Sequence, residues 1–142
     1  MFDMYKQISR SLFIPIIATI LLSSCALWNG LMKGKELAES AVVEFHNRLN
    51  AQQCSEIYEQ ADNRFKQQHE KSAALKACKA IHERLGKVKS SNLLGFNIES
   101  TPTETLATLT YNTEFTHVTI TEEFVLVIEG DKARIVGYNL MQ

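Results

Sequence analysis

Residues 107–140, ATLTYNTEFTHVTITEEFVLVIEGDKARIVGYNL, contain the pattern that decides the fold class. Between Ala107 and Phe115 apolar side chains alternate with polar ones in a Thr-rich segment, and only a β-strand satisfies this period of two. Gly130-Asp131 predicts a turn, and residues 133–140 predict the last strand. The strand before that turn has apolar residues of one parity, interrupted by Glu122: Val118, Ile120, Phe124, Leu126 and Ile128.

The period changes on the N-terminal side of this segment. Residues 88–98 predict the first strand, and three amphipathic helices are expected before it, over 35–49, 54–65 and 74–85. Gly86 follows the third helix, at the position where a left-handed C-cap is common. Helices followed by an antiparallel sheet indicate an α+β fold, with three N-terminal helices packed on a curved four-stranded antiparallel sheet.

The order of these elements is similar to that of a known protein superfamily, and so are Tyr111 and three short segments. The segments are Leu85-Gly86, Glu123-Phe124-Val125-Leu126 and Ile135-Val136-Gly137-Tyr138. They resemble small exported domains of unknown function in the nuclear-transport-factor-two-like, or cystatin-like, superfamily. The resemblance covers residues 35–142 and implies one domain with a cystatin-like cone that can hold a pocket. Ala133 departs from the pattern, since such domains often carry Trp there.

The N-terminus has the features of an export signal. Lys6 and Arg10 supply positive charge, and an apolar run follows from Leu12 to Leu22. This run is eleven residues long, too short to span a bilayer as a helix. Small residues then precede a cysteine in Leu22-Ser23-Ser24-Cys25. Residues 1–24 therefore predict a cleaved secretory signal peptide.

The same four residues resemble the bacterial lipoprotein motif. The resemblance implies a diacylglyceryl group on the Cys25 sulfur and an amide-linked acyl chain, which together hold a protein stably on its membrane. Ala26 follows the cysteine, whereas an Asp there would resemble the inner-membrane retention signal of enterobacterial lipoproteins. The resemblance therefore points to the outer membrane, with the domain facing the periplasm. Residues 25–34 include Leu27, Trp28 and Leu31, and they suit either a membrane-proximal tether or a helical segment that leads into the domain.

Two further cysteines remain for the folded domain, Cys54 and Cys78. Export would place them in an oxidising compartment, so an even pair favours a disulfide. Two buried free thiols are the alternative, because cysteine packs well as a small apolar residue. In an ideal antiparallel helix hairpin the two cysteines would be out of register, so the bond requires a steep crossing or a short second helix.

The sequence contains no recognisable catalytic set. Enzymes of the resembling superfamily perform isomerisations or dehydrations with a buried carboxylate, His or Tyr. Glu114 and His117 have opposite parity on their strand, so a dyad between them is not expected. No other pair of titratable residues is expected to converge. The candidates for acid–base chemistry are Tyr58, Tyr111, Glu114, His117 and Tyr138.

Composition and spacing argue against several other functions. The net charge is −1 without a basic block, so nucleic acid is not an expected partner. His46, His69 and His82 lie on separate helical segments, and the cysteines lack the spacing of a zinc site, so no metal is expected. No phosphate-binding loop or nucleophile elbow is present, and no cofactor is expected.

We therefore expect a non-catalytic envelope lipoprotein whose domain binds a protein partner or a small apolar ligand on the concave face of its sheet. There are two alternatives: an enzyme that uses the same cavity, and a structural spacer in the envelope. Two titratable groups converging in the cavity would favour the enzyme. The residues expected to line this cavity are Tyr58, Leu109, Tyr111, Phe124 and Tyr138.

Overall fold

The computed structural model describes the backbone of residues 14–142 and the side chains of residues 26–142. Its contacts divide the chain into two compact units, Met1–Lys33 and Gly34–Gln142. The charged start of the predicted signal peptide lies outside the described residues, and so does the Cys25 side chain. The fold described below is that of the second unit.

Helix α2 (Ile14–Asn50) starts earlier than the expected position 35. Residues 26–34 are helical, because nothing in this segment breaks a helix more strongly than Gly30 and Gly34, which helices tolerate. Leu27 is 78% exposed and Trp28 is 64% exposed. Among the described residues, no helix combines the length and apolar composition that crossing a membrane requires.

Three shorter helices follow: α3 (Cys54–Gln60), α4 (Asn63–Gln68) and α5 (Lys71–Leu85). The single helix predicted over 54–65 is therefore wrong in one respect, since it is split in two. The break is at Ala61 and Asp62, which both have extended backbones. The Asp62 carboxylate accepts a hydrogen bond from the Arg64 backbone N–H at 2.9 Å, so Asp62 is the N-cap of a new helix.

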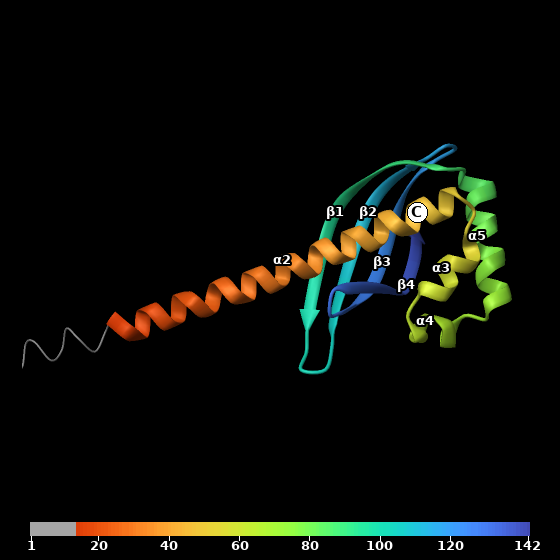
Figure 1. Cartoon of the computed structure of the whole chain (residues 1–142). Helices are drawn as coiled ribbons and strands as arrows, with labels where there is room; N and C mark the ends of the chain where they lie inside the picture. Colours follow the sequence, from red (N-terminus) through yellow and green to blue (C-terminus); the bar gives the residue numbers. More distant parts are fainter. Residues whose placement is uncertain (1–13) are drawn as a thin grey trace, which may run out of the picture. The chain divides into compact units, whose positions relative to one another are not determined.

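The sheet confirms the predicted four antiparallel strands. They are β1 (Val88–Ser100), β2 (Thr105–Phe115), β3 (Thr119–Glu129) and β4 (Lys132–Met141), in the order β1-β2-β3-β4. The part of α2 within the domain crosses one face of the curved sheet, and the shorter helices gather beyond β4 (Figure 1). The fold is a mixed α+β domain with an open antiparallel sheet.

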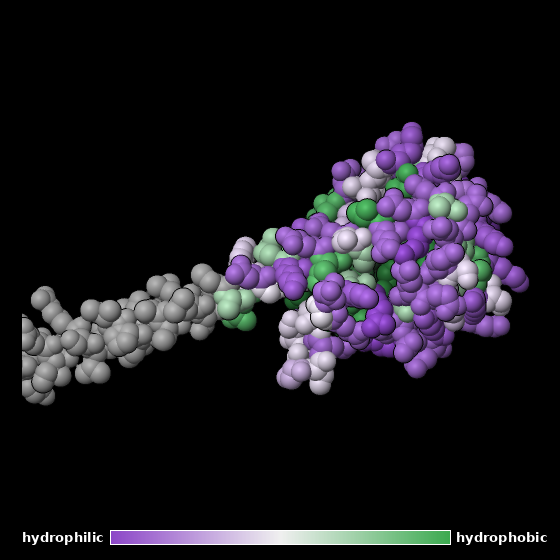
Figure 2. Space-filling model, in the orientation of Figure 1, coloured by the Kyte–Doolittle hydropathy of each residue, from purple (hydrophilic) through white to green (hydrophobic). Residues whose placement is uncertain are grey.

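The core lies between α2 and the inner face of the sheet. Every second residue of β2 from Ala107 to Phe115 is buried, as the alternation predicts. The matching stripe of α2 consists of Ala38, Val42, Phe45 and Leu49, each at most 7% exposed. The outer surface is mainly hydrophilic on the face shown in Figure 2, with apolar residues in separate patches.

Two residues fix how helices and strands are joined. The Asn50 side chain, at the end of α2, donates to the Val88 carbonyl at 3.0 Å and accepts from the Val88 N–H at 2.8 Å. Gly86 ends α5 as predicted, with φ of +83° and ψ of −156°, a region that only glycine adopts without strain. A Cβ atom at this position would lie 2.6 Å from the Thr116 Cβ.

Candidate functional site

An apolar cleft lies between α5 and the rest of the domain, with a volume of about 350 Å³. Small side chains on α5 create the space, since this helix presents Ala73, Ala74 and Ala77 where larger residues would fill it. The opposite walls come from α2, α3, α4 and β4. The remaining lining residues are Phe45, Leu49, Cys54, Ile57, Tyr58, Ala61, Phe65, His69, Cys78, Ile81, Ile135 and Tyr138.

The hydroxyl groups that line the cleft already have partners. Tyr58 donates to the His69 carbonyl at 3.2 Å, and Tyr138 donates to Glu122 Oε1 at 2.6 Å. Among the described buried side chains, only His82 Nδ1 lacks a hydrogen-bond partner, and His82 is not a cleft residue. The cleft therefore offers apolar surface to a ligand.

Cys54 and Cys78 both line this cleft and lie at disulfide distance. Their sulfur atoms are 2.07 Å apart and their Cα atoms 5.8 Å apart. The arrangement is possible because α3 is short and starts at Cys54, which is the short second helix that the bond requires. The bond links α3 to α5 and so holds two walls of the cleft together.

A buried polar network lies beside the cleft, within the core. His46 Nε2 lies 2.8 Å from Glu122 Oε2, and Thr113 Oγ1 donates to the same oxygen at 2.5 Å. His46 is 5% exposed, while Thr113 and Glu122 are fully buried. Because a carboxylate only accepts, His46 Nε2 must carry a proton. Tyr138 completes the network through Oε1 of Glu122 and is the one member that also lines the cleft.

The backbone explains how these residues meet. His46 follows Val42 by one turn on the buried stripe of α2, and Glu122 is in phase with the inward residues of β3. On β4 the register shifts, since Val125 pairs with Gly137 and Leu126 with Ile135. This β-bulge leaves one extra residue and turns Tyr138 to the inner face, where it can reach Glu122.

The network also determines the protonation of its members. Burial raises the pKa of Glu122, but the hydrogen bond and charge of His46, with the hydroxyls of Thr113 and Tyr138, outweigh burial and hold this pKa below its ordinary value. Burial and the negative charge of Glu122 raise the pKa of Tyr138. Burial, with smaller effects of Glu39 and Glu122, raises the pKa of Tyr111 to about 12.

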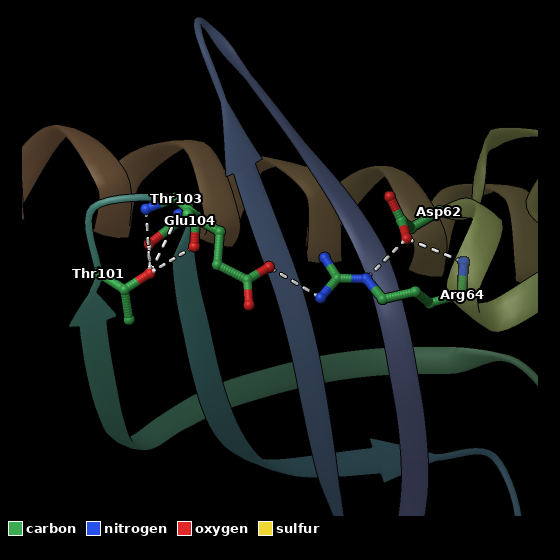
Figure 3. Close-up of polar contacts among 5 residues, drawn as sticks. All are labelled: Asp62, Arg64, Thr101, Thr103 and Glu104. Atoms are coloured by element: carbon green, nitrogen blue, oxygen red, sulfur yellow. Dashed lines mark hydrogen bonds and ion pairs between the residues drawn. The ribbon is translucent and has the colours of Figure 1, made fainter.

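A third polar cluster ties α4 to the β1–β2 hairpin. Arg64 donates to Asp62 Oδ1 at 3.0 Å and to Glu104 Oε2 at 2.8 Å (Figure 3). Hydrogen bonds from Arg64 help to hold the pKa of Asp62 below its ordinary value, although burial acts in the opposite direction. Thr101 Oγ1 stabilises the hairpin turn by accepting from the backbone N–H groups of Thr103 and Glu104. This cluster is partly exposed and supports the fold.

Residues 41–138 match a protein family described as "Protein of unknown function (DUF4019)". The chain belongs to the DUF4019 family. The matched range contains every residue that lines the apolar cleft and all four members of the buried network. No curated protein is detectably similar to the chain.

The cleft of the DUF4019 domain does not lie on the concave face of the sheet, where the sequence predicts a cavity. Tyr58 and Tyr138 line the cleft, but Leu109, Tyr111 and Phe124 do not, and they are 0%, 6% and 0% exposed. The reason is that α2 covers the concave face of the sheet and these three side chains pack against it. The open space is displaced to the side, between α5 and β4.

The expectation that no titratable pair converges is also wrong, because His46 and Glu122 meet. Two signals in the sequence point to them. His46 continues the row of Ala38 and Val42 at a spacing of four, and Glu122 keeps the parity of Ile120 and Phe124. An acidic residue in phase with a buried strand face requires a buried partner, and a histidine on the buried stripe of a helix can supply it.

The other candidates lie apart from the cleft. Glu114 is exposed, and Lys89 and Ser90 donate to its carboxylate at 3.5 and 3.3 Å. His117 is also exposed and follows the end of β2. Gln52 Nε2 lies 3.0 Å from His82 Nε2. Among the described residues, no three His, Cys, Asp or Glu side chains come together as metal ligands would.

Proposed function

We propose that this DUF4019 protein is a non-catalytic envelope lipoprotein whose domain binds a small apolar ligand in the cleft beneath α5. The observation that carries the proposal is the cleft itself, with about 350 Å³ of space and mainly apolar walls. This volume lies within the range of small-molecule sites, which are concave and mostly apolar. Displacement of water from such walls supplies the binding energy.

The position of the titratable pair supports binding over catalysis. A general acid or base must lie within hydrogen-bond reach of the proton that it transfers. Glu122 is fully buried and His46 is 5% exposed, and neither lines the cleft. Tyr138 lines it, but its hydroxyl is engaged by Glu122 and its pKa is raised. The network therefore serves the fold, and an isomerase or dehydratase is the less favoured function.

A protein partner is the second candidate, and one observation supports it. Strand β1 is at the edge of the sheet and exposes two large apolar side chains, with Leu94 at 62% and Phe96 at 43%. Edge strands with apolar side chains pair readily with other chains. A partner on β1 would leave the cleft free, so the two forms of binding can be measured separately.

The anchor and the location belong to the same proposal. Cys25, after the short apolar run, would carry the acyl groups and hold the domain at the membrane, with the outer membrane favoured by Ala26. A periplasmic location would suit the cysteine pair, since the periplasm is oxidising. The helices followed by a curved meander support a cystatin-like cone, with α2 on the concave face.

Titration with a neutral apolar fluorophore, N-phenyl-1-naphthylamine, tests the proposal. The chain carries Cys25→Ala, so that no acyl group or detergent competes for the cleft. We expect saturable binding at one site, which Ala77→Trp abolishes by filling the cleft. Lys79→Trp places the same side chain on α5 outside the cleft lining and should bind as the parent does. Equal binding by both variants would refute the proposed site.

A further inference from the structure

A second cavity adjoins the first beneath the same helix, with a volume of about 300 Å³. Ile81 is the one described residue that lines both cavities, so the two adjoin at this side chain. The other walls come from α5, β3 and the end of β4. The lining residues are Ala80, Ile81, Arg84, Leu85, Ile120, Leu140 and Gln142.

The two cavities follow each other along α5 and β4. The first contacts α5 at residues 73–81 and β4 at Ile135 and Tyr138, and the second contacts α5 at residues 80–85 and β4 at Leu140. Residue numbers therefore increase along both α5 and β4 from the first cavity to the second. The two cavities therefore lie end to end between α5 and β4, with Ile81 where they adjoin.

Charge is present at one end of this space. Arg84 is the only charged side chain among the described residues that line the second cavity. It is exposed and forms no ion pair with another described side chain, whereas Arg48, Arg64 and Arg134 each pair with a carboxylate. The first cavity contains no Asp, Glu, Lys or Arg in its described lining. An elongated ligand would meet Arg84 and the polar Gln142 at one end and mainly apolar walls along the rest.

We infer that the ligand is a single-chain aliphatic carboxylate, a long-chain fatty acid, with its carboxylate on Arg84 and its chain passing Ile81 into the first cavity. The inference rests on the proposed function and names its ligand class. An arginine binds a carboxylate through two parallel N–H···O bonds. A flexible unbranched chain can pass a single side chain, which a rigid or branched ligand of equal volume could not do.

Calorimetric titration with saturated fatty acids of increasing length tests chain length, because an acid short enough to stay at Arg84 would not displace a probe from the first cavity. Each added methylene should tighten binding about fourfold while it enters apolar space, from about 0.8 kcal/mol per buried methylene. Affinity should stop rising when the chain fills both cavities. Ile81→Trp should weaken the long acids, which must pass this side chain, more than the short ones, which only touch it from the second cavity. Equal effects on long and short acids would overturn a chain that spans both cavities.

Alcohols of matched length test the carboxylate. Arg84→Gln should weaken the acid about two- to fivefold, the range of an exposed ion pair, and leave the alcohol unchanged. Lys79→Gln removes a charge from α5 outside both cavities and should change neither. An acid that binds no better than its alcohol, with no effect of Arg84→Gln, would overturn the inference. If the neutral fluorophore still bound in the first cavity, the proposed function would remain supported.

Discussion

His46 Nε2 and Glu122 Oε2 lie 2.8 Å apart although the residues are 76 positions apart in the chain. The pair connects α2 to the inner face of β3 through the centre of an otherwise apolar core. Two charges or dipoles in such a place are costly unless they satisfy each other, and Thr113 and Tyr138 complete the hydrogen bonds of the carboxylate. The stability of the domain therefore depends on the whole network.

Replacing Glu122 by alanine should destabilise the domain strongly. The expected loss is about 3 to 5 kcal/mol in the free energy of unfolding, because His46, Thr113 and Tyr138 would lose their common partner. Urea denaturation of the disulfide-bonded protein measures it. Glu123→Ala is the matched control on the same strand, where only an exposed contact with Asn139 is lost. It should change stability by about 0.5 kcal/mol or less.

The acid dependence of stability should also report Glu122. Its pKa in the folded state is below the ordinary value of 4.5, so its contribution is fully present above that ordinary pKa. That contribution is lost as the pH falls through the folded pKa. Denaturation curves between neutral and acidic pH should therefore show a smaller loss for Glu122→Gln than for the parent. Parallel pH profiles of the two proteins would contradict a stabilising role of the Glu122 carboxylate. Asp62 titrates in the same direction in both proteins and cancels in the comparison.

Much of this fold can be predicted from the sequence because it follows from period and parity. The alternation from Ala107 to Phe115 gives β2 and its buried face, and Gly86 marks the end of α5. The break at Asp62 is missed because it depends on a local capping bond. The position of Tyr138 depends on a β-bulge, which shifts parity without a clear signal in the sequence.

The site could be predicted only in part, for a related reason. The cysteine pair follows from an even count, and Tyr58 and Tyr138 do line the cleft. The cleft lies beside the sheet because the alanines of α5 leave space there. A pattern of small residues in the sequence does not by itself indicate whether a neighbouring side chain fills such a space. His46 and Glu122 meet only through tertiary packing.

The bond between Cys54 and Cys78 should contribute substantially to stability. The residues are 24 positions apart, and closing a loop of this length stabilises the fold by about 3.5 kcal/mol in the chain-entropy model. The Cys54→Ala/Cys78→Ala variant should lose about this amount in urea denaturation. Alkylation without reductant, followed by intact mass measurement, should label neither cysteine. Two labelled thiols in the native protein would show that the bond does not form.

Substitution of Cys25 tests the lipid anchor. Cys25→Ala should release the protein from membranes or block its processing, because the acylated thiol is then missing. Fractionation of cells and mass spectrometry of the mature N-terminus measure this. Ser72→Ala is the control, since it changes an exposed residue of the folded domain and should leave membrane attachment intact. An unmodified N-terminus in membrane-bound protein would rule out the anchor.

The position of a bound ligand tests the central claim most directly. Amide chemical shifts of the ¹⁵N-labelled Cys25→Ala chain, recorded by NMR as N-phenyl-1-naphthylamine is added, locate the binding site without a substitution in the folded domain. We expect shifts at Ala73, Ala77 and Ile81 of α5 and at Ile135 and Tyr138 of β4. Shifts confined to the exposed edge strand at Leu94 and Phe96, with α5 unchanged at saturation, would contradict it.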